Sequence, residues 1–128
     1  MAAAWAVMNH LGDDGYLRLA GQARRATREL ATAIEACPDL ELRAAPDAMI
    51  VTFGAADPRR LDVFALADEL WRRGWYVDRQ QPPDSLHCTV NAVHDGLIPD
   101  FVAELHAAID AVIDATTAGT GGSYGTLE

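Results

Sequence analysis

Apolar residues in this chain recur first at helical spacing and then in short strand-like runs, and the two periods alternate along its length. The first long segment predicts a helix with one buried stripe, formed by residues three or four positions apart: Tyr16, Ala20, Ala23, Thr27, Leu30, Ile34 and Cys37. Asp13 or Asp14 can cap its start, and Pro38 ends it. Residues 2–11 predict a shorter helix, with a break at Gly12 to Gly15.

Four strand-like runs follow, in two pairs separated by a helix. Residues 40–43 and 49–53 predict a hairpin. A helix is expected between Asp62, which can cap its start, and Gly74, which can close its end. Residues 75–77 begin a third strand, and residues 86–93 alternate as a fourth with four residues facing the core: Leu86, Cys88, Val90 and Ala92. Pro99 suits the first turn of a last helix. This order predicts an α+β, two-layer fold.

The last helical repeat ends near residue 115. The expected folded domain is therefore 1–115, followed by a flexible, glycine-rich tail over 116–128.

Composition excludes several kinds of partner. The 128 residues are 50% hydrophobic and carry a net charge of −9, which argues against a nucleic-acid partner. No apolar run has the length of a membrane span, and the amino terminus lacks the charged start of a secretory signal. Cys37 and Cys88 have no paired spacing, so both are expected to be reduced thiols in a cytoplasmic protein.

Known catalytic patterns are absent. The chain has no G-x-S-x-G elbow and no closely spaced ligand pair for zinc. It also has no lysine, because all ten basic residues are arginine.

Several segments stand out together by their order and spacing: Trp5, Gly12-Asp13-Asp14-Gly15-Tyr16, residues 62–70, Arg73-Gly74-Trp75, Gln80-Gln81-Pro82-Pro83 and His87. They resemble the carboxy-terminal small domain of fold-type I pyridoxal-phosphate lyases and decarboxylases, of the aspartate aminotransferase-like superfamily. The resemblance runs from about Ala2 to Ile113 and is closest to sphingosine phosphate lyases and group II amino-acid decarboxylases.

The resemblance implies a small, antiparallel-rich, four-stranded sheet covered by helices. It also implies a missing large domain that binds pyridoxal phosphate, a small amino substrate, a homodimeric parent and carbon–carbon lyase or decarboxylase chemistry. Such enzymes hold the cofactor on a lysine amine, which an always-charged guanidinium cannot replace. This chain alone is therefore expected to be inactive, with no catalytic or cofactor-binding residue of its own. Met1 falls inside the family pattern, which suggests a truncated chain or a split gene.

In such a family the loop 79–85 and the next strand are the expected substrate contacts, through Arg79, Gln81 and His87. Arg79 can receive a carboxylate or phosphate, but the sequence favours a surface ion pair with Asp78 or Asp84. His87 can be a polar group at the site entrance or a locally bonded sheet histidine. The rival function is a free-standing small-molecule-binding or regulatory module, because a fold alone does not determine function.

Overall fold

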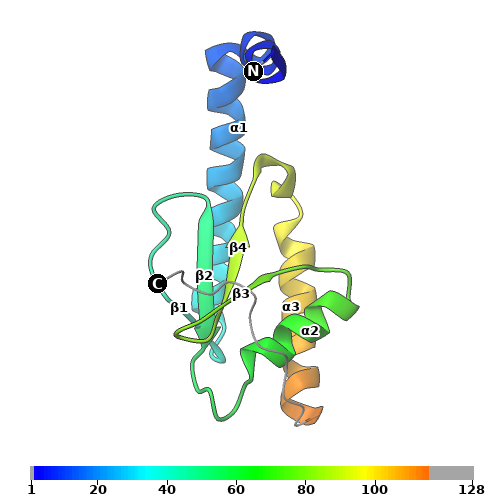
Figure 1. The fold of residues 1–128 in the computed structure, drawn as a ribbon. Helices are drawn as coiled ribbons and strands as arrows, with labels where there is room; N and C mark the ends of the chain where they lie inside the picture. Colours follow the sequence, from blue (N-terminus) through cyan, green and yellow to red (C-terminus); the bar gives the residue numbers. More distant parts are fainter. Residues whose placement is uncertain (1, 116–128) are drawn as a thin grey trace.

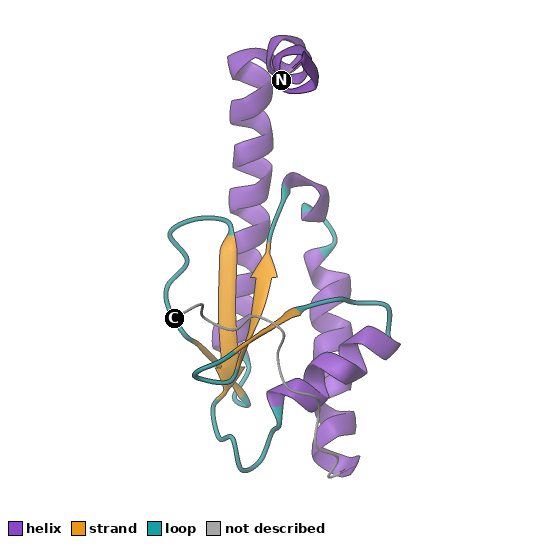
Figure 2. Ribbon diagram, viewed as in Figure 1, coloured by secondary structure: helices purple, strands orange, loops and turns teal. Residues whose placement is uncertain are grey.

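The computed structural model describes residues 2–115, which form a four-stranded sheet packed against three helices (Figures 1 and 2). In chain order the elements are α1 (Ala2–Ala36), β1 (Leu40–Leu42), β2 (Ile50–Ala55), α2 (Val63–Arg72), β3 (Asp78–Gln80), β4 (Ser85–Thr89), the short 3₁₀ turn η1 (Ala92–His94) and α3 (Ile98–Ala115). The predicted α+β class is confirmed. The expected tail at 116–128 lies outside the described residues, and the domain boundary at 115 stays a prediction.

The sheet is entirely antiparallel, with strand order β1-β2-β4-β3. One face carries the core residues Val51 and Phe53 of β2 and Leu86 of β4. They join one apolar cluster with residues of all three helices, including Leu30, Ile34, Leu66, Leu70, Leu105 and Ile109. On the other face, Ile50 and Thr89 are exposed. The helices therefore form one layer and the sheet the other.

The first helix bends at Gly12, as the sequence predicts. Gly12 has φ +59°, a left-handed conformation that is open to glycine and costly for other residues. The side chain of Leu11 then packs over Gly15, where an added Cβ would lie 3.0 Å from the Leu11 Cβ. The two glycines thus serve different purposes: one permits the turn, and the other lets the two arms meet closely.

Only the second half of α1 packs on the sheet. Ala23, Leu30 and Ile34 are buried, whereas Tyr16 and Ala20 are exposed, so the buried stripe was predicted too long. Figure 1 shows the physical reason: the first half of α1 extends past the sheet, where no other helix or strand of residues 2–115 covers it.

Local capping sets the bounds of α2. The Asp62 carboxylate accepts hydrogen bonds from the backbone amides of Phe64 and Ala65, which have no partner inside the helix. At the other end Gly74 has φ +89°, and the amide of Trp75 donates back to the Leu70 carbonyl at 2.9 Å. The predicted cap and stop are both confirmed.

The last two strands are shorter than predicted. The third begins at Asp78 rather than at residue 75, because the Trp75 amide is already bonded to the end of α2. The fourth ends at Thr89, so Ala92 is not a core strand residue. There the Asn91 amide donates to Nδ1 of His94 at 2.9 Å, which starts the turn η1 instead of extending the strand.

Candidate functional site

The three predicted substrate contacts lie on and beside the β3–β4 hairpin, but the fold does not bring them together. Arg79 pairs with Leu86 across the ladder, and Asp78 pairs with His87. Because neighbouring residues of a strand point to opposite faces, Arg79 lies on the helix side and His87 on the other side. Gln81 is exposed in the turn, where its side chain donates to Asp84 at 3.4 Å. Their contact with a substrate stays a prediction.

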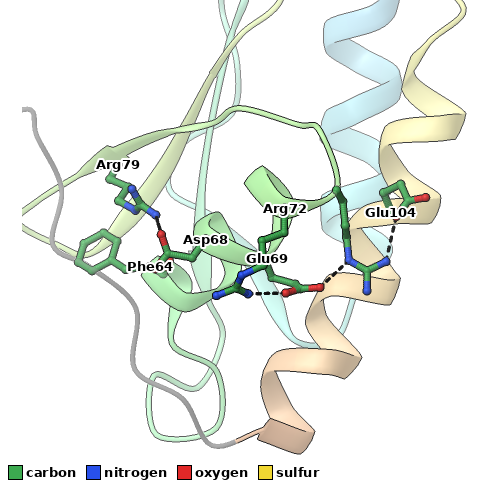
Figure 3. Close-up of polar contacts among 7 residues, drawn as sticks. Phe64, Asp68, Glu69, Arg72, Arg79 and Glu104 are labelled. Atoms are coloured by element: carbon green, nitrogen blue, oxygen red, sulfur yellow. Dashed lines mark hydrogen bonds and ion pairs between the residues drawn. The ribbon is translucent and has the colours of Figure 1, made fainter.

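Arg79 is bound to the helix layer (Figure 3). Its guanidinium donates to the Asp68 carboxylate and, at 3.4 Å, to the Phe64 carbonyl, both on α2. Both charged side chains are largely buried, with exposed fractions of 21% and 30%. The sequence suggested Asp78 or Asp84 as partner instead. Those carboxylates are near in sequence, but the strand directs Arg79 toward α2.

A second charged group joins α2 to α3 (Figure 3). Glu69 accepts from Arg72 at 2.5 Å and from Arg73 at 2.9 Å, and Arg73 also donates to Glu104 of α3 at 3.0 Å. The hydrogen bond from Arg72, supported by Arg73, holds the pKa of the Glu69 carboxyl below its ordinary value despite some desolvation. The polar side of α2 is therefore held by paired charges.

His87 lines a cavity of about 280 Å³, named here the His87 cavity. Its apolar walls come from β4, α3 and the segment after α2, and include Trp75, Val77, Val90, Ile98 and Phe101. Polar groups lie among them: Asp78, His87, Thr89 and His94. The Nε2 atom of His87 is buried and has no hydrogen-bond partner among the described residues.

A second cavity lies beside the proline-containing loop, and its volume is about 330 Å³. Arg43 lines it and lies across Gly54 of β2, where any Cβ would overlap the guanidinium. Arg43 also donates to the Asp84 carbonyl at 3.1 Å, so it ties the loop to the first hairpin. A glycine inside a strand commonly marks such a close approach, but the strand was predicted to end at residue 53, so Gly54 fell outside it.

The described residues offer neither a reactive thiol nor a metal site. Burial, together with the Asp78 carboxylate, raises the pKa of Cys88 to about 12, so it stays a neutral thiol near pH 7. Cys37 is buried, and both cysteines are free. Within residues 2–115 no cluster of three or more potential ligands could hold a metal ion.

Known proteins match almost the whole chain. It is 31% identical over 112 residues to a sphingosine-1-phosphate lyase of Arabidopsis thaliana, a match that covers 88% of this chain and 20% of that protein. A solved sphingosine-1-phosphate lyase of Burkholderia pseudomallei superposes with a TM-score of 0.80 at 26% identity, over 90% of this chain and 26% of that one. The chain is a relative of the carboxy-terminal small domain of fold-type I pyridoxal-phosphate lyases.

The small domain has the same fold in a decarboxylase. Glutamate decarboxylase of Lactobacillus brevis superposes with a TM-score of 0.78 at 21% identity, over 87% of this chain and 27% of that one. No family model matches the chain. The chain spans about one fifth of the length of the sphingosine-1-phosphate lyases that it matches.

This sequence lacks the residue type to which the family's cofactor is attached. Covalent attachment of pyridoxal phosphate needs a lysine amine, and this sequence contains none. The two arginines beside the hairpin are also engaged, Arg79 with Asp68 and Arg43 with the Asp84 carbonyl. The cofactor therefore has no covalent attachment point within this sequence.

Proposed function

We propose that this small domain supplies a wall of the substrate entrance in a pyridoxal-phosphate-dependent carbon–carbon lyase or amino-acid decarboxylase. The observation that carries the proposal is the match to sphingosine-1-phosphate lyases over nearly the whole chain, in both sequence and fold. The cofactor and its lysine would belong to a large partner domain outside this sequence. The substrate would be a small amine or amino acid, and the parent would be a cytoplasmic homodimer. Within the described residues, no helix is both long and apolar enough to span a membrane.

The loop between β3 and β4 suits the role of a wall because several contacts hold it. Arg79 anchors one side to α2, and Arg43 binds the Asp84 carbonyl on the other. The Ser85 hydroxyl donates to the Pro83 carbonyl at 3.0 Å. A loop held in this way loses little conformational entropy when a substrate binds against it. Gln81 at the tip and His87 on the strand are the proposed direct contacts. Arg79 is already paired with Asp68, so it would contact substrate either while keeping this ion pair or after breaking it.

Kinetics of the full-length enzyme that carries this sequence test the proposal. Arg79→Ala and His87→Ala should each lower kcat/KM while cofactor absorbance stays unchanged, because the domain contacts substrate and the partner domain holds the cofactor. Arg59→Ala, a change at a side chain that is 91% exposed, is the matched control. Unchanged kcat/KM in both test variants would make the hairpin structural only.

The gene offers a second test. A reading frame that continues upstream into a histidine–lysine cofactor motif would support the lyase assignment. A frame without such a motif would favour the alternative, a free-standing small-molecule-binding or regulatory module. The His87 cavity is the observation that favours this alternative, because residues of this chain line a concave space of about 280 Å³.

A further inference from the structure

Arg43 joins two hairpins that are far apart in the sequence. It follows β1 directly, and its backbone amide donates to the Thr52 carbonyl of β2 at 2.8 Å. Its side chain then crosses β2 at Gly54 and donates to the Asp84 carbonyl at 3.1 Å. The side chain is 25% exposed, and its Nε atom is buried. An arginine held in this way has lost most of the rotamer freedom of a surface side chain.

Gly54 makes this crossing possible. Its neighbour Phe53 is buried in the core, so a side chain at Gly54 would project from the opposite face of the sheet. A Cβ built there would lie 2.5 Å from Cζ of Arg43. The atoms in conflict belong to the far end of a flexible side chain. An alanine at this position should therefore displace the guanidinium and leave the backbone of β2 in place.

The loop of residues 81–84 depends on this contact for its attachment to the first hairpin. The two other hydrogen bonds of the loop are local: Gln81 donates to the Asp84 carboxylate at 3.4 Å, and the Ser85 hydroxyl donates to the Pro83 carbonyl at 3.0 Å. Within residues 2–115, the bond from Arg43 is thus the hydrogen bond that joins this loop to a part of the fold outside its own hairpin.

We propose that Arg43 is the positioning residue of the β3–β4 loop, and that glycine is required at residue 54 because the guanidinium occupies the space of a side chain. The first hairpin, which carries none of the proposed substrate contacts, thereby sets where Gln81 lies. The consequence for substrate binding rests on the entrance role proposed above, whereas the effect on the loop does not.

NMR relaxation of the purified chain tests the effect on the loop. Arg43→Met keeps the length of the side chain and removes its donors. The backbone order parameters of Gln81 and Asp84 should then fall from about 0.85 to below about 0.6, the range of flexible segments. Gly54→Ala should give the same fall, and unshifted amides in α3 would show that the fold is retained.

A double variant and a matched glycine sharpen this test. Arg43→Met combined with Gly54→Ala should be no more mobile than either single variant, because both changes remove one and the same contact. Gly21→Ala is the control, since a Cβ there would meet only the end of Arg25, at 3.9 Å. It should leave the order parameters of the loop unchanged.

Kinetics of the full-length enzyme that carries this sequence test the consequence for substrate. Each single variant should raise KM about two- to tenfold, the effect of losing one hydrogen bond that orders the loop before binding. Both kcat and the cofactor absorbance should stay within about twofold of the original, because an effect on KM alone indicates lost binding rather than lost chemistry.

The two measurements separate the two possible failures. Unchanged order parameters in either single variant, or additive losses in the double variant, would overturn the positioning role of Arg43 whatever the kinetics. A mobile loop together with an unchanged KM would uphold that role and reject the entrance function proposed for the loop.

Discussion

At the scale of single residues, this domain uses arginine to pair with carboxylates of its own fold. Arg25 pairs with Asp95, Arg60 with Asp39, and Arg79 with Asp68, in each case between separate segments. A guanidinium suits this purpose because it is always charged and presents several donors in one plane. We therefore expect Arg79 to contribute to the free energy of unfolding, whether or not it contacts a substrate.

Replacing Arg79 with alanine should therefore destabilise the fold. The change removes a largely buried pairing with Asp68 and should cost about 1–2 kcal/mol in the free energy of unfolding. Urea unfolding of the purified chain measures this. Arg59→Ala, at the exposed pair with Asp57, should change stability by less than about 0.5 kcal/mol. Equal losses in the two variants would contradict the structural role of Arg79.

A second residue-scale prediction concerns the absent lysine. Incubation with pyridoxal phosphate and then borohydride should leave no stoichiometric adduct at an internal position, because the α-amino group is the one primary amine in this sequence. Peptide mass mapping would locate any adduct. An Arg59→Lys variant, which adds an exposed amine, serves as the positive control. A stoichiometric internal adduct on the original chain would refute the prediction.

At the scale of elements, α2 is the helix that connects the other parts of the domain. Asp62 caps the start of α2, and Asp68 forms an ion pair with Arg79 of β3. Arg73, which follows α2, pairs with both Glu69 of α2 and Glu104 of α3. The opposite side of α2 is apolar, with Leu66 and Leu70 fully buried. Burial on one side and ion pairs on the other should make the packing of α2 dependent on pH.

Acid should weaken this packing through Glu69. Its pKa in the folded chain lies below the ordinary value of 4.5, mainly because of the hydrogen bond from Arg72. The unfolded chain therefore takes up the proton first, so the stabilisation is complete above pH 4.5 and is lost as the pH falls through the folded pKa. Glu69→Gln should lower stability at pH 7 and flatten its decline below pH 4.5 in thermal unfolding. Glu35→Gln, at an exposed position of α1, should keep the original slope.

At the scale of the whole molecule, the first arm of α1 extends beyond the other elements that the structure describes. Trp5, Val7 and Met8 are 68%, 50% and 57% exposed. Gly12 and Gly15 set this arm at an angle to the rest of α1, away from the sheet (Figure 1). Neighbouring exposed apolar side chains commonly recruit a partner.

The isolated chain should accordingly self-associate through this arm. The double variant Trp5→Gln with Met8→Gln should shift sedimentation toward the monomer, because it removes apolar area that association would bury. Val93→Gln, at an apolar side chain that is 74% exposed elsewhere, should leave the distribution unchanged. A strictly monomeric original chain would exclude the association.

Much of the fold could be predicted from the sequence because its signals are local. The turn at Gly12, the cap at Asp62 and the stop at Gly74 depend on backbone geometry and on hydrogen bonds within a few residues. The helical and strand-like periods predict the order of elements in the same way. The lack of a lysine is likewise a property of the sequence alone, and it removes the covalent attachment of the cofactor whatever the fold.

Only the tertiary structure decided what the candidate site contains. The choice of Asp68 as the partner of Arg79, the separation of Arg79 from His87 and the His87 cavity all depend on which segments pack together. The same is true of Tyr16, whose spacing fits a buried stripe although its side chain is 45% exposed. The spacing of apolar residues along the sequence indicates which side of a helix or strand is apolar. Burial and pairing require a second element in contact, and that contact is made between residues far apart in the sequence.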